Sequence, residues 1–253
     1  MEMQKIPKII HYCWFGDGEM SEQEKRCIAS WRRCCPDYTI QCWNETNFDF
    51  SDCRYAVEAA KAQKWGFVTD YVRLKVLYDY GGFYFDTDVE MLKNLDPLRE
   101  HRFFIGFETN ERVNDGQGVG AVARHPIIKM MLEKYQKLSF FTEEGRYNLK
   151  ESPQYRTEVL LEKGLQLTGR RQQLGDAEIY PVEYFCPKSF QTGRIRVTKN
   201  TYSIHHFRGS WHTKKERRYI RITQGLNRLI GERAGSKFVR WLYACNDLIK
   251  HKK

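Results

Sequence analysis

The chain has 253 residues, of which 41% are hydrophobic and 14% aromatic, a composition that suffices for a buried core and excludes a disordered protein. The formal net charge is +10, but the 40 residues from Lys214 to Lys253 hold 12 Lys and Arg against 3 Asp and Glu, so +9 of it lies there. The rest is nearly neutral, which argues against a folded body that binds nucleic acid, because such a body spreads basic residues over its surface.

The sequence shows no secretory signal, since no basic start is followed by an apolar segment and a small-residue cleavage site. No apolar run reaches the length of a membrane span. We therefore expect a cytoplasmic protein, either free or peripheral on the cytoplasmic face of the membrane. The eight cysteines include no C-x-x-C pair and are few for a disulfide scaffold, so we expect reduced thiols that pack as small apolar residues.

The first 45 residues predict a strand, a helix and a second strand, which is how an α/β sheet begins. The apolar run Ile6–Gly16 indicates a buried strand, and Tyr38–Trp43 indicates its neighbour. Between them Ser21–Cys34 has helical spacing, with Ser21 and Glu24 as a capping box. In such a sheet the ligand site lies beyond the carboxyl ends of the strands.

Trp14 stands near the end of the first predicted strand, two residues before Gly16. A tryptophan there either closes the core or offers its ring to a flat ligand, because the glycine leaves room beside it. The residues themselves leave both interpretations open.

The stretch Trp65–Glu90 carries the strongest pattern in the chain. Apolar residues three and four apart predict a helix, which Gly81-Gly82 ends because glycine readily takes the left-handed conformation. Asp70 and Arg73 are three apart, so their side chains should be neighbours on this helix. The apolar positions are Val68, Val72, Leu74, Val76 and Leu77.

An aromatic strand, Phe83–Phe85, follows the glycines and leads into Asp86-Thr87-Asp88. If the chain stays extended, Asp86 and Asp88 point the same way, because side chains alternate along a strand. Two such carboxylates suit a hard divalent cation that keeps positions open for substrate phosphates. The alternative is a solvated turn, since Asp is common where a strand gives way to a loop.

The middle of the chain continues the alternation of strands and helices. A loop rich in Asn, Asp and Gly is expected at Asn110–Gly118, with strands on both sides of it. The other expected strands are Phe103–Glu108, Val119–Ala123, Ile179–Phe185 and Ile195–Val197, and the expected helices are Thr157–Gly164 and one from Pro126 to about Leu138.

The segment Thr201–Thr213 reads TYSIHHFRGSWHT, and its alternation predicts a strand that delivers one histidine to each face. A lone histidine is more often a core residue than a ligand, but His205 and His206 precede Gly-Ser-Trp. If the two aspartates hold a metal ion, one of these histidines supplies the distant third ligand.

The segment Lys214–Lys253 is basic, with apolar residues near helical spacing in two parts separated around Gly231–Gly235. One interpretation is a pair of helices packed on the domain with a solvated basic face. The other is a peripheral membrane contact, because basic amphipathic helices bind anionic lipid.

The order Asp70-x-x-Arg73, Gly-Gly, aromatic strand and Asp86-x-Asp88 is far more specific than an Asp-x-Asp triplet by itself. It resembles the core motif of the family 32 glycosyltransferases, the sugar-binding-region transferases that contain a DXD motif. It is also similar to the catalytic core of the large clostridial glucosylating toxins. The resemblance extends from Ile6 to Trp211, and its later part looks like bacterial members that build capsular polysaccharide.

This resemblance implies a GT-A fold, an α/β nucleotide-sugar-binding (Rossmann-like) mixed sheet flanked by helices. It implies one transferase domain over residues 1–213, with 214–253 as a basic amphipathic helical tail. The implied enzyme is a metal-dependent retaining hexosyltransferase that moves a sugar from a nucleotide diphosphate, with UDP-hexose expected. The implied acceptor is a saccharide, free or lipid-linked, of a capsular or surface polysaccharide, and the implied ion is Mn²⁺ or Mg²⁺.

The resemblance also assigns roles to residues by position. The aspartates Asp86 and Asp88 would hold the metal together with His206, which is followed by Phe-x-Gly-x-Trp, and Asp86 would also contact the ribose. The expected catalytic residues are Asp70, Arg73, Asp86 and Asp88, and the expected donor-binding residues are Trp14, Asp70, Arg73, Asp86, Ser210 and Trp211.

No nucleophile is evident, and the nearest candidates, Glu108 and Gln117, are expected only to line the acceptor side. We therefore expect the acceptor to attack on the face of the leaving group, with a diphosphate oxygen taking its proton. Two other functions stay open: a toxin-like effector that glycosylates a protein, and a basic membrane- or nucleic-acid-binding module whose acidic motif is structural.

Overall fold

The structure, a computed structural model, describes residues 4–209, 214–231, 234 and 237. The chain divides into two compact units, Met1–Pro187 with Val197–His206 and Lys188–Arg196 with Phe207–Lys253. The first unit contains both β-sheets, and the second contains helix α7 (Lys214–Ile230). The predicted boundary after residue 213 adjoins 210–213, which lie outside the described residues, so it stays a prediction.

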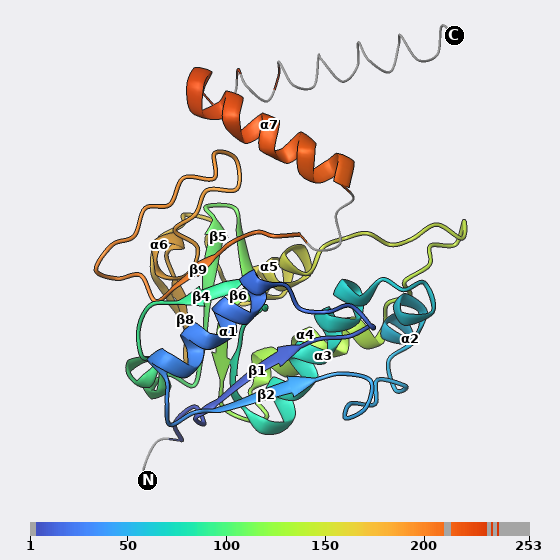
Figure 1. Cartoon of the computed structure of the whole chain (residues 1–253). Helices are drawn as coiled ribbons and strands as arrows, with labels where there is room; N and C mark the ends of the chain where they lie inside the picture. The colour runs from blue at the N-terminus through green and yellow to red at the C-terminus, as the bar shows by residue number, and fades with distance from the viewer. Residues whose placement is uncertain (1–3, 210–213, 232–233, 235–236, 238–253) are drawn as a thin grey trace, which may run out of the picture. The chain divides into compact units, whose positions relative to one another are not determined.

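A seven-stranded mixed sheet forms the centre of the first unit (Figure 1). Strand β1 runs parallel to β2 and β3, whereas β6 is antiparallel to both β3 and β5. The predicted fold class, a mixed α/β sheet flanked by helices, is confirmed. In spatial order the strands are β2 (Thr39–Trp43), β1 (Ile9–Cys13), β3 (Gly82–Tyr84), β6 (Arg112–Ala121), β5 (Phe103–Thr109), β8 (Ala177–Tyr180) and β7 (Gln172–Leu174).

Each face of this sheet packs on its own hydrophobic cluster. One cluster joins alternate sheet residues, among them Phe103, Ile105 and Phe107, to four helices. The residues between them, such as Phe104, face the other cluster, as strand alternation requires. The first set of covering elements is α2 (Arg54–Lys61), α3 (Trp65–Tyr80), α4 (Pro126–Gln136) and α5 (Ser152–Leu161), and the second is α1 (Glu22–Cys34), α6 (Val182–Phe185) and β4 (Val89–Met91), which pairs with β9 (Ser203–His205).

Local sequence signals explain the bounds of two helices, α1 and α3. Helix α1 begins after Ser21 with the predicted capping box, in which the Ser21 N–H donates to Glu24 Oε2 at 2.7 Å. Helix α3 ends at Tyr80 because Gly81 has a φ of 66°, where a side chain is strained, and a Cβ there would lie 2.7 Å from the Ala123 nitrogen. Both predicted helices are confirmed.

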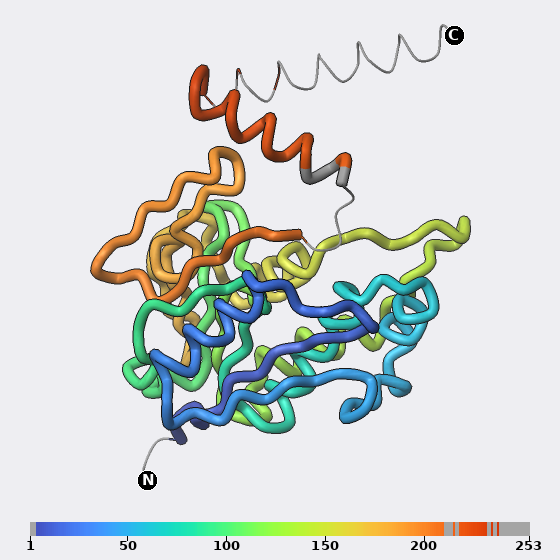
Figure 2. Tube along the Cα trace, in the orientation of Figure 1, coloured from blue at the N-terminus to red at the C-terminus, as the bar shows by residue number. Residues whose placement is uncertain are grey.

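The ribbon of β4 and β9 brings together two segments that are far apart in the sequence. Val89 pairs with His205 and Met91 with Ser203 in antiparallel register. Figure 2 shows the C-terminal strand returning alongside the segment that follows β3. Neither the ribbon nor α2 was among the sequence predictions. Among the described helices, none combines the length and apolar character of a membrane span.

Three predicted elements are wrong. In the expected loop 110–118 only residues 110 and 111 form a turn, and the rest belongs to strand β6, whose register against β5 shifts twice along the pair. Residues Val182–Phe185 form helix α6 instead of extending the strand, because Pro181 begins a helical turn at its N-terminus. The expected strand Ile195–Val197 is reduced to an isolated bridge between Ile195 and Lys188. Composition misled the first two predictions, since Asn, Asp and Gly favour turns and aromatic residues favour strands.

Candidate active site

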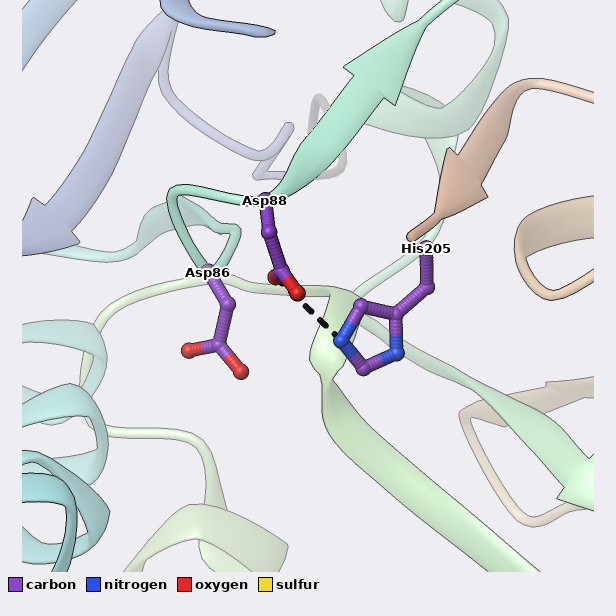
Figure 3. Close-up of side chains that lie close together, drawn as sticks. All are labelled: Asp86, Asp88 and His205. Atoms are coloured by element: carbon purple, nitrogen blue, oxygen red, sulfur yellow. Dashed lines mark ion pairs between the residues drawn. The ribbon is translucent and has the colours of Figure 1, made fainter. Parts of the chain in front are cut away.

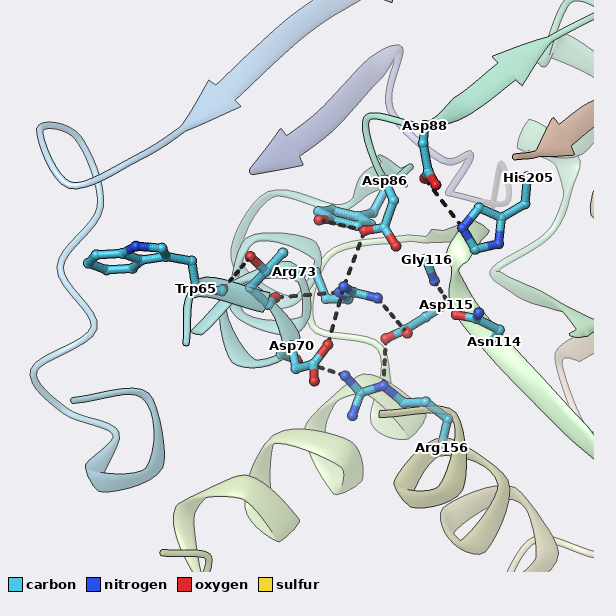
Figure 4. Close-up of polar contacts among 12 residues, drawn as sticks. Trp65, Asp70, Arg73, Asp86, Asp88, Asn114, Asp115, Gly116, Arg156 and His205 are labelled. Carbon is cyan, nitrogen blue, oxygen red and sulfur yellow. Dashed lines mark hydrogen bonds and ion pairs between the residues drawn. The ribbon is translucent and has the colours of Figure 1, made fainter. Parts of the chain in front are cut away.

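Arg73 lies on the buried face of α3 and is shared by three carboxylates (Figure 4). Its Nη2 lies 3.2 Å from Oδ1 of Asp70 and 3.2 Å from Oδ1 of Asp86, and its Nη1 lies 2.9 Å from Oδ1 of Asp115. The guanidinium group also packs over the Tyr84 ring, 4.9 Å from its centroid. The predicted contact between Asp70 and Arg73 is thus confirmed. Arg73 also pairs with Asp115 of strand β6, which the helical spacing alone does not predict.

A second arginine closes this network from α5. Arg156 is fully buried, and its Nε lies 2.5 Å from Oδ2 of Asp115. Its Nη2 donates to the Asp70 carbonyl oxygen at 2.7 Å. Asp115 therefore lies between two arginines. Its Oδ1 pairs with Arg73 and its Oδ2 with Arg156, which fixes the orientation of the carboxylate.

The Asp86–Asp88 segment is a tight turn between β3 and β4 rather than an extended strand end. The Val89 N–H donates to the Asp86 carbonyl at 3.0 Å, which closes the turn, and the Asp86 N–H donates to the Gly116 carbonyl at 2.8 Å. The Asp86 and Asp88 carboxylates still converge. They do so because the chain turns between them, and not because side chains alternate along a strand. Gly116 leaves room for the Asp86 carboxylate, because a Cβ there would lie 2.1 Å from its Oδ2 and would displace it.

His205 completes a cluster with the two aspartates (Figure 3). Ligand atoms of Asp86, Asp88 and His205 all lie within 4.8 Å of one another, and His205 Nε2 is 3.3 Å from Oδ1 of Asp88. The prediction chose His206, and the structure places His205 in that position instead. His206 lies on the other side of the strand, where its Nε2 is 2.9 Å from Oε2 of Glu90.

The residues of this cluster fit a divalent cation. Four carboxylates, Asp70, Asp86, Asp88 and Asp115, against the two guanidinium groups of Arg73 and Arg156 leave a formal charge of −2 when His205 is neutral. Two carboxylates and one imidazole leave coordination positions for phosphate oxygens. An imidazole ligand favours a softer ion such as Mn²⁺ over Mg²⁺, whose ligands are oxygens.

The pKa values of the two buried acids Asp70 and Asp115 shift in opposite directions. Burial raises the pKa of Asp70 from 3.8 to about 6, although the charges of Arg73 and Arg156 lower it in part. Burial would raise the pKa of Asp115 as well, but Arg156 and Arg73 outweigh it and hold this pKa below its ordinary value. Asp115 is thus a permanent anion that positions the arginines, whereas Asp70 titrates close to neutral pH.

A carboxylate and a buried thiol set the charge state of His205. Burial would lower the pKa of His205, but the Asp88 carboxylate and a hydrogen bond with Cys186 outweigh it and hold this pKa well above its ordinary value. A bound cation would therefore displace a proton from this imidazole, because a ligand histidine is neutral.

Sequence reasoning missed part of the site. Asn114, Asp115 and Gly116 lie on β6, and the Asn114 side chain orders this strand by accepting from the Gly116 N–H at 2.7 Å. Arg156 had no sequence signal that separates it from a surface arginine. The β6 residues had no such signal either, because Asn, Asp and Gly in a row favour a turn.

The remaining predicted residues lie outside this network or outside the described residues. The Trp14 ring is half-buried after β1, and its indole N–H donates to the Gly18 carbonyl at 2.7 Å. The Gln117 side chain is buried and donates to the carbonyls of Gly106 and Phe107, so it supports the sheet. Glu108 is nearly buried and accepts from Asn114 at 2.9 Å. Ser210 and Trp211 lie outside the described residues.

Several solved structures resemble this chain at a low level. The "PaToxG Glycosyltransferase" is 20% identical with a TM-score of 0.49, over 63% of this chain and 70% of that one. The galactosyltransferase LgtC, solved with donor and acceptor sugar analogs, is 13% identical with a TM-score of 0.43, over 91% and 95% of the two chains. A likeness of this degree does not establish a shared fold.

The curated relatives are fungal transferases. Inositol phosphoceramide mannosyltransferase 1 of Schizosaccharomyces pombe is 28% identical over 150 residues, 56% of this chain and 47% of that protein. Mannosyl phosphorylinositol ceramide synthase CSH1 of Saccharomyces cerevisiae is 27% identical over 157 residues, 54% of this chain and 38% of that protein. The matched part of the chain thus spans less than half the length of these relatives.

The family comparison concerns the part of the chain that carries the site. The matching family model is described as "Glycosyltransferase sugar-binding region containing DXD motif", and it matches residues 21–105. This segment includes Asp70, Arg73, Asp86 and Asp88. The helix and the acidic turn that build one wall of the site thus match a glycosyltransferase sugar-binding region that contains a DXD motif.

Proposed function

We propose that this protein is a metal-dependent glycosyltransferase of family 32 that moves a hexose from a nucleotide diphosphate sugar to a saccharide acceptor. The observation that carries the proposal is the convergence of Asp86, Asp88 and His205 within 4.8 Å, beside the Asp70–Arg73 pair on α3. A cation held there would act as a Lewis acid and neutralise the charge that develops on the departing diphosphate.

The protein's own residues would bind and orient the donor sugar. The Asp70 carboxylate is fixed by Arg73 and lies at the edge of the network, with a side chain that is 10% exposed. It can therefore accept hydrogen bonds from sugar hydroxyls without moving. Arg73 in turn holds Asp86 beside the metal cluster, so one guanidinium group would couple sugar binding to metal geometry.

The transfer would retain the anomeric configuration by attack on the face of the leaving group. The acceptor oxygen forms a bond to the anomeric carbon as the bond to the diphosphate oxygen breaks, and that oxygen takes the acceptor's proton. The described carboxylates of the site support this route because none is poised as a nucleophile. Asp70, Asp86 and Asp115 pair with Arg73, Asp88 with His205, and Glu108 with Arg112.

We propose the donor and the acceptor as chemical classes, a nucleotide diphosphate hexose and a saccharide. UDP-hexose follows from the resemblance to capsule-type enzymes, whereas the names of the fungal relatives add a mannosyl donor and a phosphoinositol lipid acceptor. The surface polysaccharide acceptor remains our first choice. A toxin-like protein acceptor is the alternative.

A thermal-shift screen tests the proposal most directly, because a ligand bound only by the folded state raises the melting temperature. We expect one sugar nucleotide among UDP-glucose, UDP-galactose and GDP-mannose to raise it with Mn²⁺ present and much less without the ion. Release of the nucleoside diphosphate with a saccharide acceptor then measures turnover, and NMR of the anomeric proton reports retention. No shift with any donor in either condition contradicts the proposal.

Replacing either histidine distinguishes the metal ligand from its neighbour. We expect His205→Ala to weaken Mn²⁺ activation by more than the roughly 10–100-fold that loss of an outer-shell partner costs. The matched variant His206→Ala should keep the Mn²⁺ dependence of turnover within a few-fold, because His206 contacts Glu90 instead. Equal losses in the two variants would contradict the assignment.

The contact of Gly116 with Asp86 predicts a steric effect on the chemistry. In Gly116→Ala the new Cβ would meet Asp86 Oδ2 at 2.1 Å and Arg73 Nη1 at 3.0 Å, so the carboxylate must shift. We expect turnover to fall by about 10²-fold, which a displacement of about 1 Å can cause. The control is Gly66→Ala on the same helix as Arg73, where a Cβ meets nothing within 4 Å, and its turnover should be unchanged.

The raised pKa of Asp70 predicts a loss of activity on the acid side. As the pH falls through about 6 the carboxylate gains a proton and no longer accepts from sugar hydroxyls, so kcat/KM should fall. The folded protein binds this proton more tightly than the unfolded chain, so Asp70 itself adds stability as the pH falls from about 6 toward 3.8. A pH profile of kcat/KM, with melting temperatures, separates titration from unfolding.

The corresponding variant identifies the titrating group. Asp70→Asn should show lower kcat/KM at neutral pH and a flat profile between pH 7 and 5, since its amide does not titrate in this range. An unchanged acid limb in this variant would assign the limb to another group.

A further inference from the structure

The second unit combines a helix with a loop that is fastened to one side of it. Gln224 Nε2 donates to the Phe190 carbonyl at 2.8 Å, and Asn227 Nδ2 donates to the Gln191 carbonyl at 2.9 Å. Arg228 donates to the Thr192 carbonyl. These contacts fasten the loop Lys188–Arg196 along the side of α7 that carries Gln224, Asn227 and Arg228.

Apolar residues in helical register stand on a different face of the helix. Ile222 and Leu229 are seven positions apart, so at about 100° per residue they lie on one face, away from Gln224 and Asn227. Ile230 lies at the edge of that face, toward Asn227. The exposed fractions of Ile222, Leu229 and Ile230 are 38%, 81% and 53%. Exposed apolar residues are ordinary when they stand singly, but here they form a stripe, and Phe190 and Ile195 of the loop are exposed as well.

Basic residues surround this stripe. Helix α7 contains six Lys and Arg against Glu216 alone, and the loop adds Lys188, Arg194 and Arg196, a formal charge of +8 for the two segments. Lys215 and Arg218 are exposed residues of the helix, and they stand seven and four positions before Ile222, so they continue the stripe toward the N-terminus of the helix as cations. Exposed apolar groups flanked by cations are the pattern of a helix that lies in a membrane interface.

We propose that the second unit binds the surface of an anionic lipid bilayer, with Ile222, Leu229 and Ile230 entering the headgroup boundary. The basic side chains would then approach lipid phosphates, whose charge is opposite to theirs. Nucleic acid explains the charge but not the stripe, because phosphate contacts do not use Leu or Ile. A second copy of this chain would bring two surfaces of like charge together.

The test is co-sedimentation of the full chain with vesicles, without donor or acceptor. We expect binding to phosphatidylcholine vesicles that contain phosphatidylglycerol, much weaker binding to pure phosphatidylcholine, and a loss of binding as salt rises. The variants Leu229→Ser and Arg218→Glu should each weaken binding by about tenfold or more. Matched controls in the first unit are Leu167→Ser and Lys163→Glu, both at exposed positions, which should bind like the unaltered protein.

Three results would overturn the proposal: no binding to anionic vesicles, equal binding to both vesicle types, or an unchanged affinity of Leu229→Ser. Circular dichroism of each variant confirms that the helix persists. Light scattering tests self-association of the chain. If the mass rose with protein concentration and Leu229→Ser abolished this rise, the stripe would be a self-association surface instead. Because this experiment uses no sugar nucleotide, its failure leaves the proposed transferase activity standing, and a failed donor screen leaves membrane binding standing.

Discussion

Asp88→Asn should lower turnover of the sugar nucleotide by at least about 10²–10³-fold, the range measured in other enzymes for loss of one electrostatic stabiliser of a transition state. The change keeps the volume of the side chain but removes a negative charge from the metal cluster and the anionic partner of His205. The fold should persist, because Asp88 is not among the carboxylates that pair with Arg73 or Arg156. Release of nucleoside diphosphate with and without Mn²⁺ measures the effect.

The control for this variant is Asp79→Asn, which removes a half-buried aspartate of α3 that pairs with Lys75. It changes the net charge equally, so its turnover should stay near that of the unaltered protein. If Asp88→Asn retained both its rate and its response to Mn²⁺, the acidic turn would be structural. The protein would then be better explained as a binding module than as a transferase.

Arg156→Met should destabilise the protein by about 3–5 kcal/mol, the cost of removing one partner from a buried ion pair. Asp115 would keep only Arg73, and the Asp70 carbonyl would lose the donor that now lies 2.7 Å away. Both groups are buried, so water cannot replace the lost contacts without opening the core between α3 and α5. Urea denaturation followed by circular dichroism gives the change in the free energy of unfolding.

Arg146→Met is the control for this prediction, because Arg146 is exposed and pairs only loosely with Glu144 at 3.5 Å. Its free energy of unfolding should change by less than about 0.5 kcal/mol. Turnover of Arg156→Met under conditions where it is folded should also fall, since Asp115, held by Arg73 alone, would fix that arginine less rigidly. A cost below about 1 kcal/mol would show that Arg73 alone satisfies Asp115.

The sequence sufficed for the parts of the fold that depend on local chemistry. The capping box at Ser21, the apolar face of α3 and the stop at Gly81 all follow from residues within a few positions of one another. The Asp70–Arg73 pair followed in the same way, from helical spacing. Because both aspartates of the acidic turn come from one short segment, their convergence could also be expected, although its cause was a turn.

The rest of the site depends on contacts that short-range patterns do not contain. The choice between His205 and His206 depends on the register of β9 against β4, and a shift of one residue would exchange their faces. Asp115 was assigned to a loop because its neighbours favour turns, and only pairing with β5 makes this segment a strand. Arg156 becomes a site residue only once α5 packs beside β6.

The ribbon of β4 and β9 has a consequence for synthesis of the protein on the ribosome. The helix, the acidic turn and both buried arginines are all made before residue 160, but the imidazole that completes the cluster follows much later, at His205. A nascent chain that has emerged only as far as β8 therefore holds the Asp86 and Asp88 carboxylates after the inner strand β3 without the imidazole that completes the cluster. It would gain its affinity for metal ions only when β9 has emerged and paired with β4, so the onset of tight metal binding during translation would mark completion of the first unit.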